Sequence, residues 1–116
     1  MNRYELHGVA RDITNGKRVV VCASHNYSNI IFKEVEKLLE DRGLTPTRVL
    51  RANGRQRIEC GEGELRFAHS YDALRGIEAD KVLMSIGVRE SQSFLEQWLP
   101  NARLVTNVGS IEQISG

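Results

Sequence analysis

Residues 18–24, RVVVCAS, and residues 26–43, NYSNIIFKEVEKLLEDRG, decide the fold class of this chain. The first stretch is β-branched and nearly all apolar, which is typical of a strand covered on both faces in a parallel sheet. In the second stretch apolar residues recur with a period of 3.6, which predicts an amphipathic helix that ends at Gly43. A covered strand followed directly by such a helix indicates an α/β protein.

The sequence on either side extends this pattern. Residues 4–14 have helical spacing, and NGK at 15–17 ends that helix before the central strand. In chain order we then expect a strand at 47–52, a turn at 53–54, a hairpin of strands at 56–60 and 64–70, a short helix or loop at 71–79, a strand at 80–87, a helix at 89–100 ended by Pro100, and a strand at 102–108. Together they predict a three-layer α/β sandwich with a mainly parallel sheet and an inserted β-hairpin.

Length and composition limit the functional classes. The chain has 116 residues, 41% of them hydrophobic and 27% charged, which predicts a single α/β domain over residues 1–116. A net charge of +1 gives no overall attraction to a polyanion, so contact with nucleic acid would need local clustering of Arg and Lys. No apolar run has the length of a signal peptide or a membrane span, so we expect a soluble, cytoplasmic protein without membrane contact.

Cys22 and Cys60 have neither Cys-x-x-Cys spacing nor a nearby pair of His residues. They are interpreted as buried free thiols, and the alternatives are a metal site or a disulfide. We expect no metal and no cofactor.

In order and spacing these segments resemble the RecA-like core of P-loop ATPases, above all the ATPase domain of phage large terminases and, more loosely, superfamily-two helicases. Three stretches carry the resemblance. They are GKRVVVCAS with the helix after it, the hairpin RIECGEGELRFAHS, and DALRGIEADKVLM, which is similar to the family's Arg-Gly, Asp and Walker B strand. The resemblance covers roughly residues 16–87 and implies a partial RecA-like fold.

The departures from that family concern its chemistry. No G-x-x-x-x-G-K-[ST] phosphate loop is present, and NGK at 15–17 precedes a strand, whereas a phosphate loop leads into a helix. Ser85 and Ile86 stand where the resemblance places the metal-binding Asp and the water-activating Glu. Because both ends of a phosphoryl-transfer site are missing, the resemblance implies a degenerate ATPase scaffold without catalysis.

The loop after the central strand is the first candidate site. Ser24, His25, Asn26 and Ser28 are candidates to hold a ligand or phosphate at a helix N-terminus, and in the resembling proteins the equivalent loop can touch a DNA backbone. In the simpler interpretation Asn26 or Ser28 caps the helix and His25 faces solvent.

A cluster of arginines is the second candidate. Arg48, Arg51, Arg55 and Arg57, with Arg66 across the hairpin, are suited to binding phosphate in nucleic acid. Strand alternation places Arg48 and Arg51 on opposite faces, however. The alternative is therefore a solvated hairpin in which the nearby carboxylates of Glu59, Glu62 and Glu64 pair with these arginines.

Two further groups were weighed. FAHSYD places His69, Ser70 and Asp72 together, but neighbours on a strand point to opposite faces. Asp72 with Arg75 suits a structural cap. No catalytic residue is therefore assigned, and His7, His25 and Cys60 do not complete a catalytic set.

Trp98 belongs to an apolar stripe at residues 93–99 that favours the core, and a partly exposed Trp98 would instead mark a protein interface.

These observations predict a non-catalytic binding module that acts through a protein partner or nucleic acid. The resemblance implies a small phage protein related to part of a terminase or helicase ATPase domain. A second copy of the chain is a further candidate partner. If it is encoded by a phage, we expect it in the host cytoplasm. The alternative is a small-ligand or nucleotide-binding enzyme that uses the strand ends at 24–28, 70–72 and 85–87. A third interpretation is a subunit that completes an ATPase with another chain, which an exposed apolar sheet edge would support.

Overall fold

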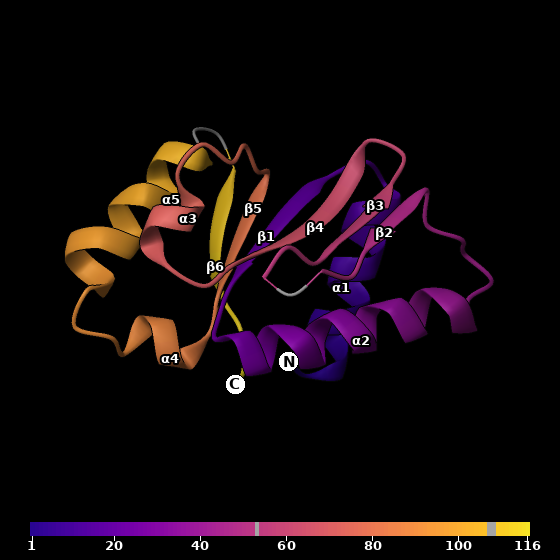
Figure 1. Cartoon of the computed structure of the whole chain (residues 1–116), viewed down its shortest axis with the longest axis horizontal. Helices are drawn as coiled ribbons and strands as arrows, with labels where there is room; N and C mark the ends of the chain where they lie inside the picture. The colour runs from indigo at the N-terminus through magenta and orange to yellow at the C-terminus, as the bar shows by residue number, and fades with distance from the viewer. Residues whose placement is uncertain (53, 107–108) are drawn as a thin grey trace.

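A six-stranded sheet lies between two layers of helices in the computed structural model, which describes residues 1–52, 54–106 and 109–116 (Figure 1). The strand order is β2-β3-β4-β1-β5-β6. The pairs β1–β4, β1–β5 and β5–β6 are parallel. The pairs β2–β3 and β3–β4 are antiparallel. The predicted three-layer α/β sandwich with an inserted hairpin is confirmed. The strands are β1 (Arg18–Cys22), β2 (Arg48–Leu50), β3 (Arg57–Cys60), β4 (Gly63–Ala68), β5 (Lys81–Met84) and β6 (Ser110–Gln113).

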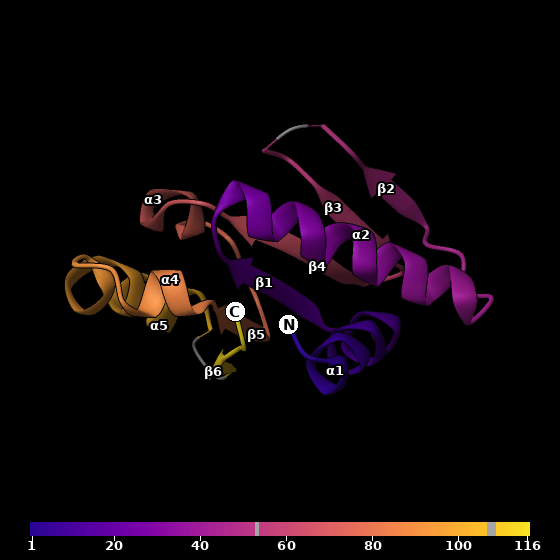
Figure 2. The ribbon, with the colours of Figure 1, turned by 90° about the horizontal axis from the view of Figure 1, so that it is seen from below.

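Helices cover the sheet unequally. Helices α1 and α2 lie on one face along β1, β3 and β4, and the remaining helices gather over the β1–β5–β6 part of the other face (Figures 1 and 2). The helices are α1 (Arg3–Thr14), α2 (His25–Asp41), α3 (Tyr71–Leu74), α4 (Ile86–Arg89), the π-helix η1 (Phe94–Trp98) and α5 (Leu99–Val105).

Alternation along the central strand divides the core in two. Val19 and Val21 of β1 face α1 and α2, while Val20 and Cys22 face α3 to α5, and all four are at most 1% exposed. Burying an aliphatic side chain of this size stabilises a fold by about 1.5 to 3 kcal/mol. The apolar run that predicted a strand covered on both faces is therefore explained.

The C-terminal third differs from the sequence-based expectation. The helix expected at 89–100 is split into α4, η1 and α5, and Pro100 lies in the first turn of α5, where the missing proline N–H is tolerated. The strand expected at 102–108 is wrong for residues 102–105, which are helical, and its last two residues lie outside the described part of the chain. The final strand is β6. The turn expected at 53–54 includes residue 53, which also lies outside the described residues.

One part of the sheet is covered by none of the described helices. On the face that α3 to α5 cover elsewhere, β2, β3 and β4 are open toward the viewer in Figure 1. We call this surface, together with Arg18 at the start of β1, the open sheet face. Its alternating residues are Arg48 on β2, Arg57 and Glu59 on β3, and Glu64 and Arg66 on β4.

None of the described helices has the length and apolar character needed to cross a membrane.

Candidate functional site

A serine ends each of the three central parallel strands and caps the helix that follows. Ser24, after β1, accepts a hydrogen bond from the backbone N–H of Tyr27 at 3.2 Å. Ser70, after β4, accepts one from Ala73 at 3.1 Å, and Ser85, after β5, accepts one from Val88 at 3.3 Å. Such a bond satisfies one of the free donors at a helix N-terminus.

These caps correct two expectations. The cap of α2 is Ser24, and neither Asn26 nor Ser28 fills that role. The cap of α3 is Ser70, while Asp72 lies in the first turn, with its carboxylate 4.0 Å from the guanidinium of Arg75, the partner expected for it.

A groove of about 450 Å³ opens at these strand ends. It lies where α2 leaves the sheet on one face and α4 on the other, which is the usual place for ligands in open α/β sheets. The groove joins Ser24 and Tyr27 to Ser85 and Gly87, but its lining does not include Ser70 or Asp72. It therefore connects two of the three strand ends that the enzyme alternative needs.

The four residues predicted to hold a phosphate differ in their exposure to solvent. Ser24, His25 and Asn26 are exposed, whereas Ser28 is fully buried and its hydroxyl lies 3.4 Å from Nδ1 of His69. They do not form one phosphate site.

His25 and His69 lie against each other at the ends of β1 and β4. Their rings stack with centroids 3.7 Å apart and an interplanar angle of 30°. Nδ1 of His69 is 3.1 Å from the carbonyl oxygen of Ala23, and because a carbonyl only accepts, this nitrogen carries the proton. We call the pair the histidine stack. Sequence reasoning missed it, and the only signal was that His25 follows one predicted strand and His69 lies near the end of another.

The arginine cluster is divided between the two faces of the hairpin region, as strand alternation predicted. Arg51 forms a bidentate ion pair with Glu36 of α2, and its guanidinium carbon lies 5.9 Å from the ring centre of Phe32. Arg48 and Arg57 lie on the open sheet face. Arg55 is exposed in the loop that leads to β3, and Gln56 in that loop donates a hydrogen bond to Asn29 of α2.

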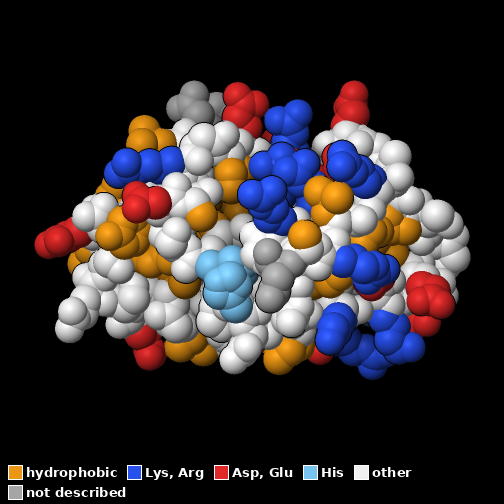
Figure 3. Space-filling view, viewed as in Figure 1, with side chains coloured by type: hydrophobic (Ala, Val, Ile, Leu, Met, Phe, Trp, Pro, Cys, Tyr) orange, Lys and Arg blue, Asp and Glu red, His pale blue; other side chains and the backbone are white. Residues whose placement is uncertain are grey.

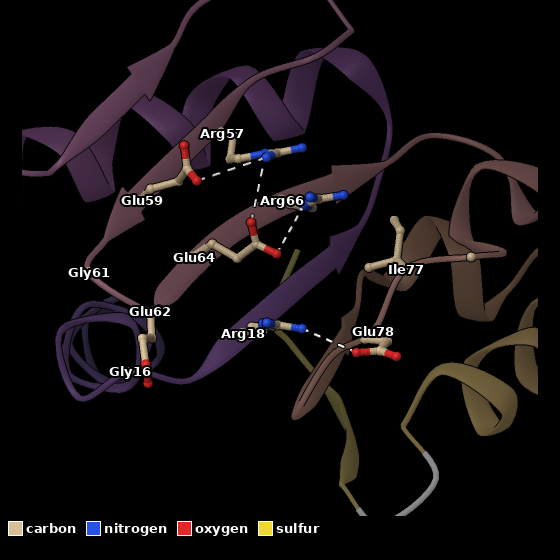
Figure 4. Close-up of a pocket in the computed structure, with 12 residues that line it drawn as sticks. Gly16, Arg18, Arg57, Glu59, Gly61, Glu62, Glu64, Arg66, Ile77 and Glu78 are labelled. Atoms are coloured by element: carbon tan, nitrogen blue, oxygen red, sulfur yellow. Dashed lines mark hydrogen bonds and ion pairs between the residues drawn. The ribbon is translucent and has the colours of Figure 1, made fainter.

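Like charges stand side by side on the open sheet face. Arg57 is directly opposite Arg66, and Glu59 is directly opposite Glu64, an arrangement that is unfavourable on its own. Diagonal and same-strand ion pairs offset it, because Glu64 lies 3.8 Å from Arg57 and 3.1 Å from Arg66 (Figure 4).

Two further ion pairs flank this group. Arg48 is 3.9 Å from Glu59, and Arg18 is 3.3 Å from Glu78. The expected pairing of the arginines with Glu59 and Glu64 is thus present, while Glu62 stands in the hairpin turn.

Not all of the arginine donors are used by these carboxylates. Arg57 and Arg66 both meet Glu64 through Nε, a terminal nitrogen of Arg57 also lies 4.0 Å from Glu59, and Figure 4 shows the terminal nitrogens of both arginines extending past Glu64 to the same side. A concavity of about 670 Å³ lies in front of them, and the charged side chains in its wall are Arg18, Arg57 and Arg66 together with Glu59, Glu62, Glu64 and Glu78. On the same face of the molecule Lys and Arg side chains are prominent over the centre and right half, with fewer acidic side chains (Figure 3).

The remaining candidates lie elsewhere. Trp98 is 5% exposed and packs edge-on against Tyr71 in the core, so it does not offer the partly exposed ring that an interface would need. His7 contacts Arg42, the residue that follows α2, and not the His69, Ser70 and Asp72 group with which it was considered. Cys22 is buried, which raises the pKa of its thiol to about 12, and burial also raises the pKa of the half-buried Cys60.

Two negative findings concern the part of the chain that the structure describes. It shows no group of three or more His, Cys, Asp or Glu side chains that could hold a metal ion. The described edge strands show no fully exposed apolar residue: Ser110, Glu112 and Gln113 of β6 and Arg48 of β2 are exposed, while Val49 and Leu50 of β2 and Ile111 of β6 are half-buried.

The element order and the strand order give this chain a fold that is also seen in phage large terminases. Three solved structures show this fold. The large terminase of a thermophilic bacteriophage matches with a TM-score of 0.63 and 13% identity over 95% of this chain and 29% of that one. A crystal form of the same terminase in complex with ADP gives a TM-score of 0.56 and 14% identity over 85% of this chain and 25% of the other.

The large terminase ATPase domain of Thermus phage P74-26 has a TM-score of 0.54 and 18% identity over 94% of this chain and 54% of its own. The chain thus spans about a quarter to a half of the structures that it matches. No family model and no curated protein matches it.

Proposed function

We propose that this chain is a non-catalytic binding module, a small phage protein related to part of a terminase ATPase domain, that contacts nucleic acid through the open sheet face. The observation that carries the proposal is the pair of adjacent guanidinium groups of Arg57 and Arg66, whose terminal nitrogens extend past their shared partner Glu64 (Figure 4). Guanidinium groups bind phosphate oxygens in a bidentate manner, and two side by side suit a phosphate backbone.

The charges of this face are balanced, and most of them are paired. Four arginines, Arg18, Arg48, Arg57 and Arg66, share the face with four carboxylates, those of Glu59, Glu62, Glu64 and Glu78, so its net charge is zero and binding would depend on the placement of the guanidinium groups. Arg18–Glu78 is an exposed ion pair, which contributes only about 0 to 1 kcal/mol to stability, whereas the pairs of Glu64 with Arg57 and Arg66 are partly buried, so a phosphate would have to bind beside Glu64.

Local geometry supports the absence of catalysis. Ser85, which stands at the metal-binding position of the resembling family, is 3% exposed and its hydroxyl caps α4. Residues 15–17 form the turn between α1 and β1, at the end of the sheet opposite the histidine stack. Neither segment is arranged to hold a phosphate and its metal.

The test is fluorescence anisotropy of labelled single-stranded and duplex DNA at about 50 and about 200 mM salt. Wild-type protein should bind at low salt and weaken steeply as salt rises. We expect Arg66→Gln to weaken binding about 5-fold and to lower the salt dependence by about one ion, as for loss of one phosphate contact.

Arg51→Gln is the matched control, because it removes the same charge from the side that faces α2 and should leave the affinity near that of the wild type. Absence of binding at low salt, or equal losses for both variants, contradicts the open sheet face and leaves a protein partner as the function to pursue.

The strand-end groove supports a second candidate, binding of a small ligand or nucleotide. Trp98, the only tryptophan in the chain, lines this groove beside Ser24, His69 and Ser85. Titration with magnesium and ATP should change Trp98 fluorescence in a saturable way if a nucleotide binds there, and an unchanged spectrum with no heat of binding rejects this candidate.

A further inference from the structure

We infer that the histidine stack is a platform for one nucleobase, so that the nucleic acid that crosses the open sheet face is single-stranded where it passes His25. The inference rests on the proposed function and adds to it a class of substrate and a residue that contacts the base.

His69 provides a rigid base for the stack. Its Nδ1 donates to the carbonyl of Ala23 at 3.1 Å and lies 3.4 Å from the hydroxyl of buried Ser28, which fixes the plane of the ring. His25 is stacked on this ring with 3.7 Å between centroids, and it is exposed to solvent. An exposed ring held flat by a second ring loses little conformational entropy when a base is added to the stack.

The surroundings of His25 supply charge for the phosphate of a base that stacks on the exposed part of its ring. Gly54 of the 54–56 loop lies beside His25, because a Cβ at that position would be in van der Waals contact with Cε1 of His25 at 3.8 Å. Arg55 of the same loop is exposed, and the first turn of α2 contains no acidic residue to repel a phosphate. Aromatic rings, His among them, stack on unpaired bases, whereas bases within a duplex are already stacked on one another.

The stack is also within reach of the arginine pair. His69 follows Arg66 by three residues along β4, which corresponds to about 10 Å at the usual strand rise. His and the central Lys and Arg side chains are visible on the same face of the molecule (Figure 3). One short oligonucleotide can therefore touch the guanidinium groups with its phosphates and His25 with a base.

The experiment compares three fluorescent probes of equal phosphate number per strand: a single strand of about ten nucleotides, an abasic strand of the same length, and a duplex. Wild-type protein should bind the base-bearing single strand more tightly than the abasic strand. His25→Ala should weaken binding of the base-bearing strand by about 5- to 100-fold, as for loss of one stacked base, and leave abasic and duplex binding unchanged.

Two variants separate stacking from other roles of the residue. His25→Phe should keep the affinity for the base-bearing strand, because it keeps a flat ring, and Asn26→Ala should behave as wild type, because it removes an exposed neighbour without a ring. A 2-aminopurine base in the probe should be quenched on binding to wild type and to His25→Phe but not to His25→Ala.

Equal affinity of the wild type for base-bearing and abasic strands overturns the platform while leaving the proposed function intact. A loss of affinity in His25→Ala that is the same for the base-bearing and the abasic strand also overturns the platform. If no probe binds at low salt, the proposed function itself fails, and the platform fails with it.

Discussion

Cys22 shows at the scale of one residue what burial in this core does to a titratable group. Its side chain is fully buried at the end of the central strand, and desolvation raises the pKa of the thiol to about 12 from an ordinary value of 9.0. The thiolate is therefore almost absent at neutral pH, and the thiol should be inert toward alkylating reagents until the protein unfolds.

The same shift predicts how stability depends on pH. Below pH 9.0 the thiol is protonated in both states, and between pH 9.0 and about 12 the unfolded chain releases a proton that the folded protein retains. The free energy of unfolding should therefore fall by about 1.4 kcal/mol per pH unit across that window because of this group. Urea unfolding at several pH values should show a shallower fall in Cys22→Ala than in the wild type, and equal slopes would contradict the prediction.

The site residues show what sequence alone can and cannot provide. The arginines at 48 and 57 and the carboxylates that pair with them follow from strand alternation, and so does the separation of Arg51. The stacking of His25 on His69 does not follow, because the two residues are far apart in the sequence and meet only since β1 and β4 pair in parallel. Identifying that pairing requires the strand order, which no local pattern specifies.

The contact between α1 and β4 depends on the lack of a side chain at one glycine. A Cβ at Gly63 would stand 1.9 Å from the carbonyl oxygen of Ile13, so the end of α1 lies directly on the first residue of β4. Gly63→Ala must push helix and strand apart and should cost about 1 to 3 kcal/mol of stability, as overpacking in a core usually does.

Gly8→Ala provides a control in the same helix. A Cβ at Gly8 meets no atom within 4 Å, and the interior of a helix favours Ala over Gly by about 1 kcal/mol, so this variant should be more stable than the wild type. Chemical denaturation of both variants measures the difference, and a Gly63→Ala protein as stable as the wild type would show that α1 does not pack as described.

The predicted elements were most accurate where a strong hydrophobic period was present and least accurate near the C-terminus. Residues 26–41 keep a regular helical period, and α2 was located closely. In residues 86–105 three short helical segments follow one another and the middle one is a π-helix, whereas the apolar stripe at 93–99 suggested one continuous helix at 89–100. A π-helix shifts the period locally, and that shift cannot be seen in the spacing of a few apolar residues.

We expect residues 1–116 to fold as a single unit. The two halves of the core share β1, whose alternate side chains enter one half or the other, so neither half can lose its packing alone. Trp98 fluorescence, which reports on the half beneath α3 to α5, and far-ultraviolet circular dichroism, which reports on the whole chain, should give one coincident urea transition. Two separate transitions would mean that the halves unfold independently.

The hairpin that carries the open sheet face is held in register by features other than its charges. Ile58 and Leu65 are opposed and fully buried beneath it, and Gly61, with a φ of 60°, begins the two-residue turn between the strands. Shifting the strands by two residues would place Arg57 opposite Glu64, so the observed pairing is not the one that charge attraction would choose. Substitutions among the arginines and glutamates of the open sheet face can therefore change its charge, or even reverse the sign, without changing the strand register. Related domains with the same backbone can in this way bind partners of opposite charge.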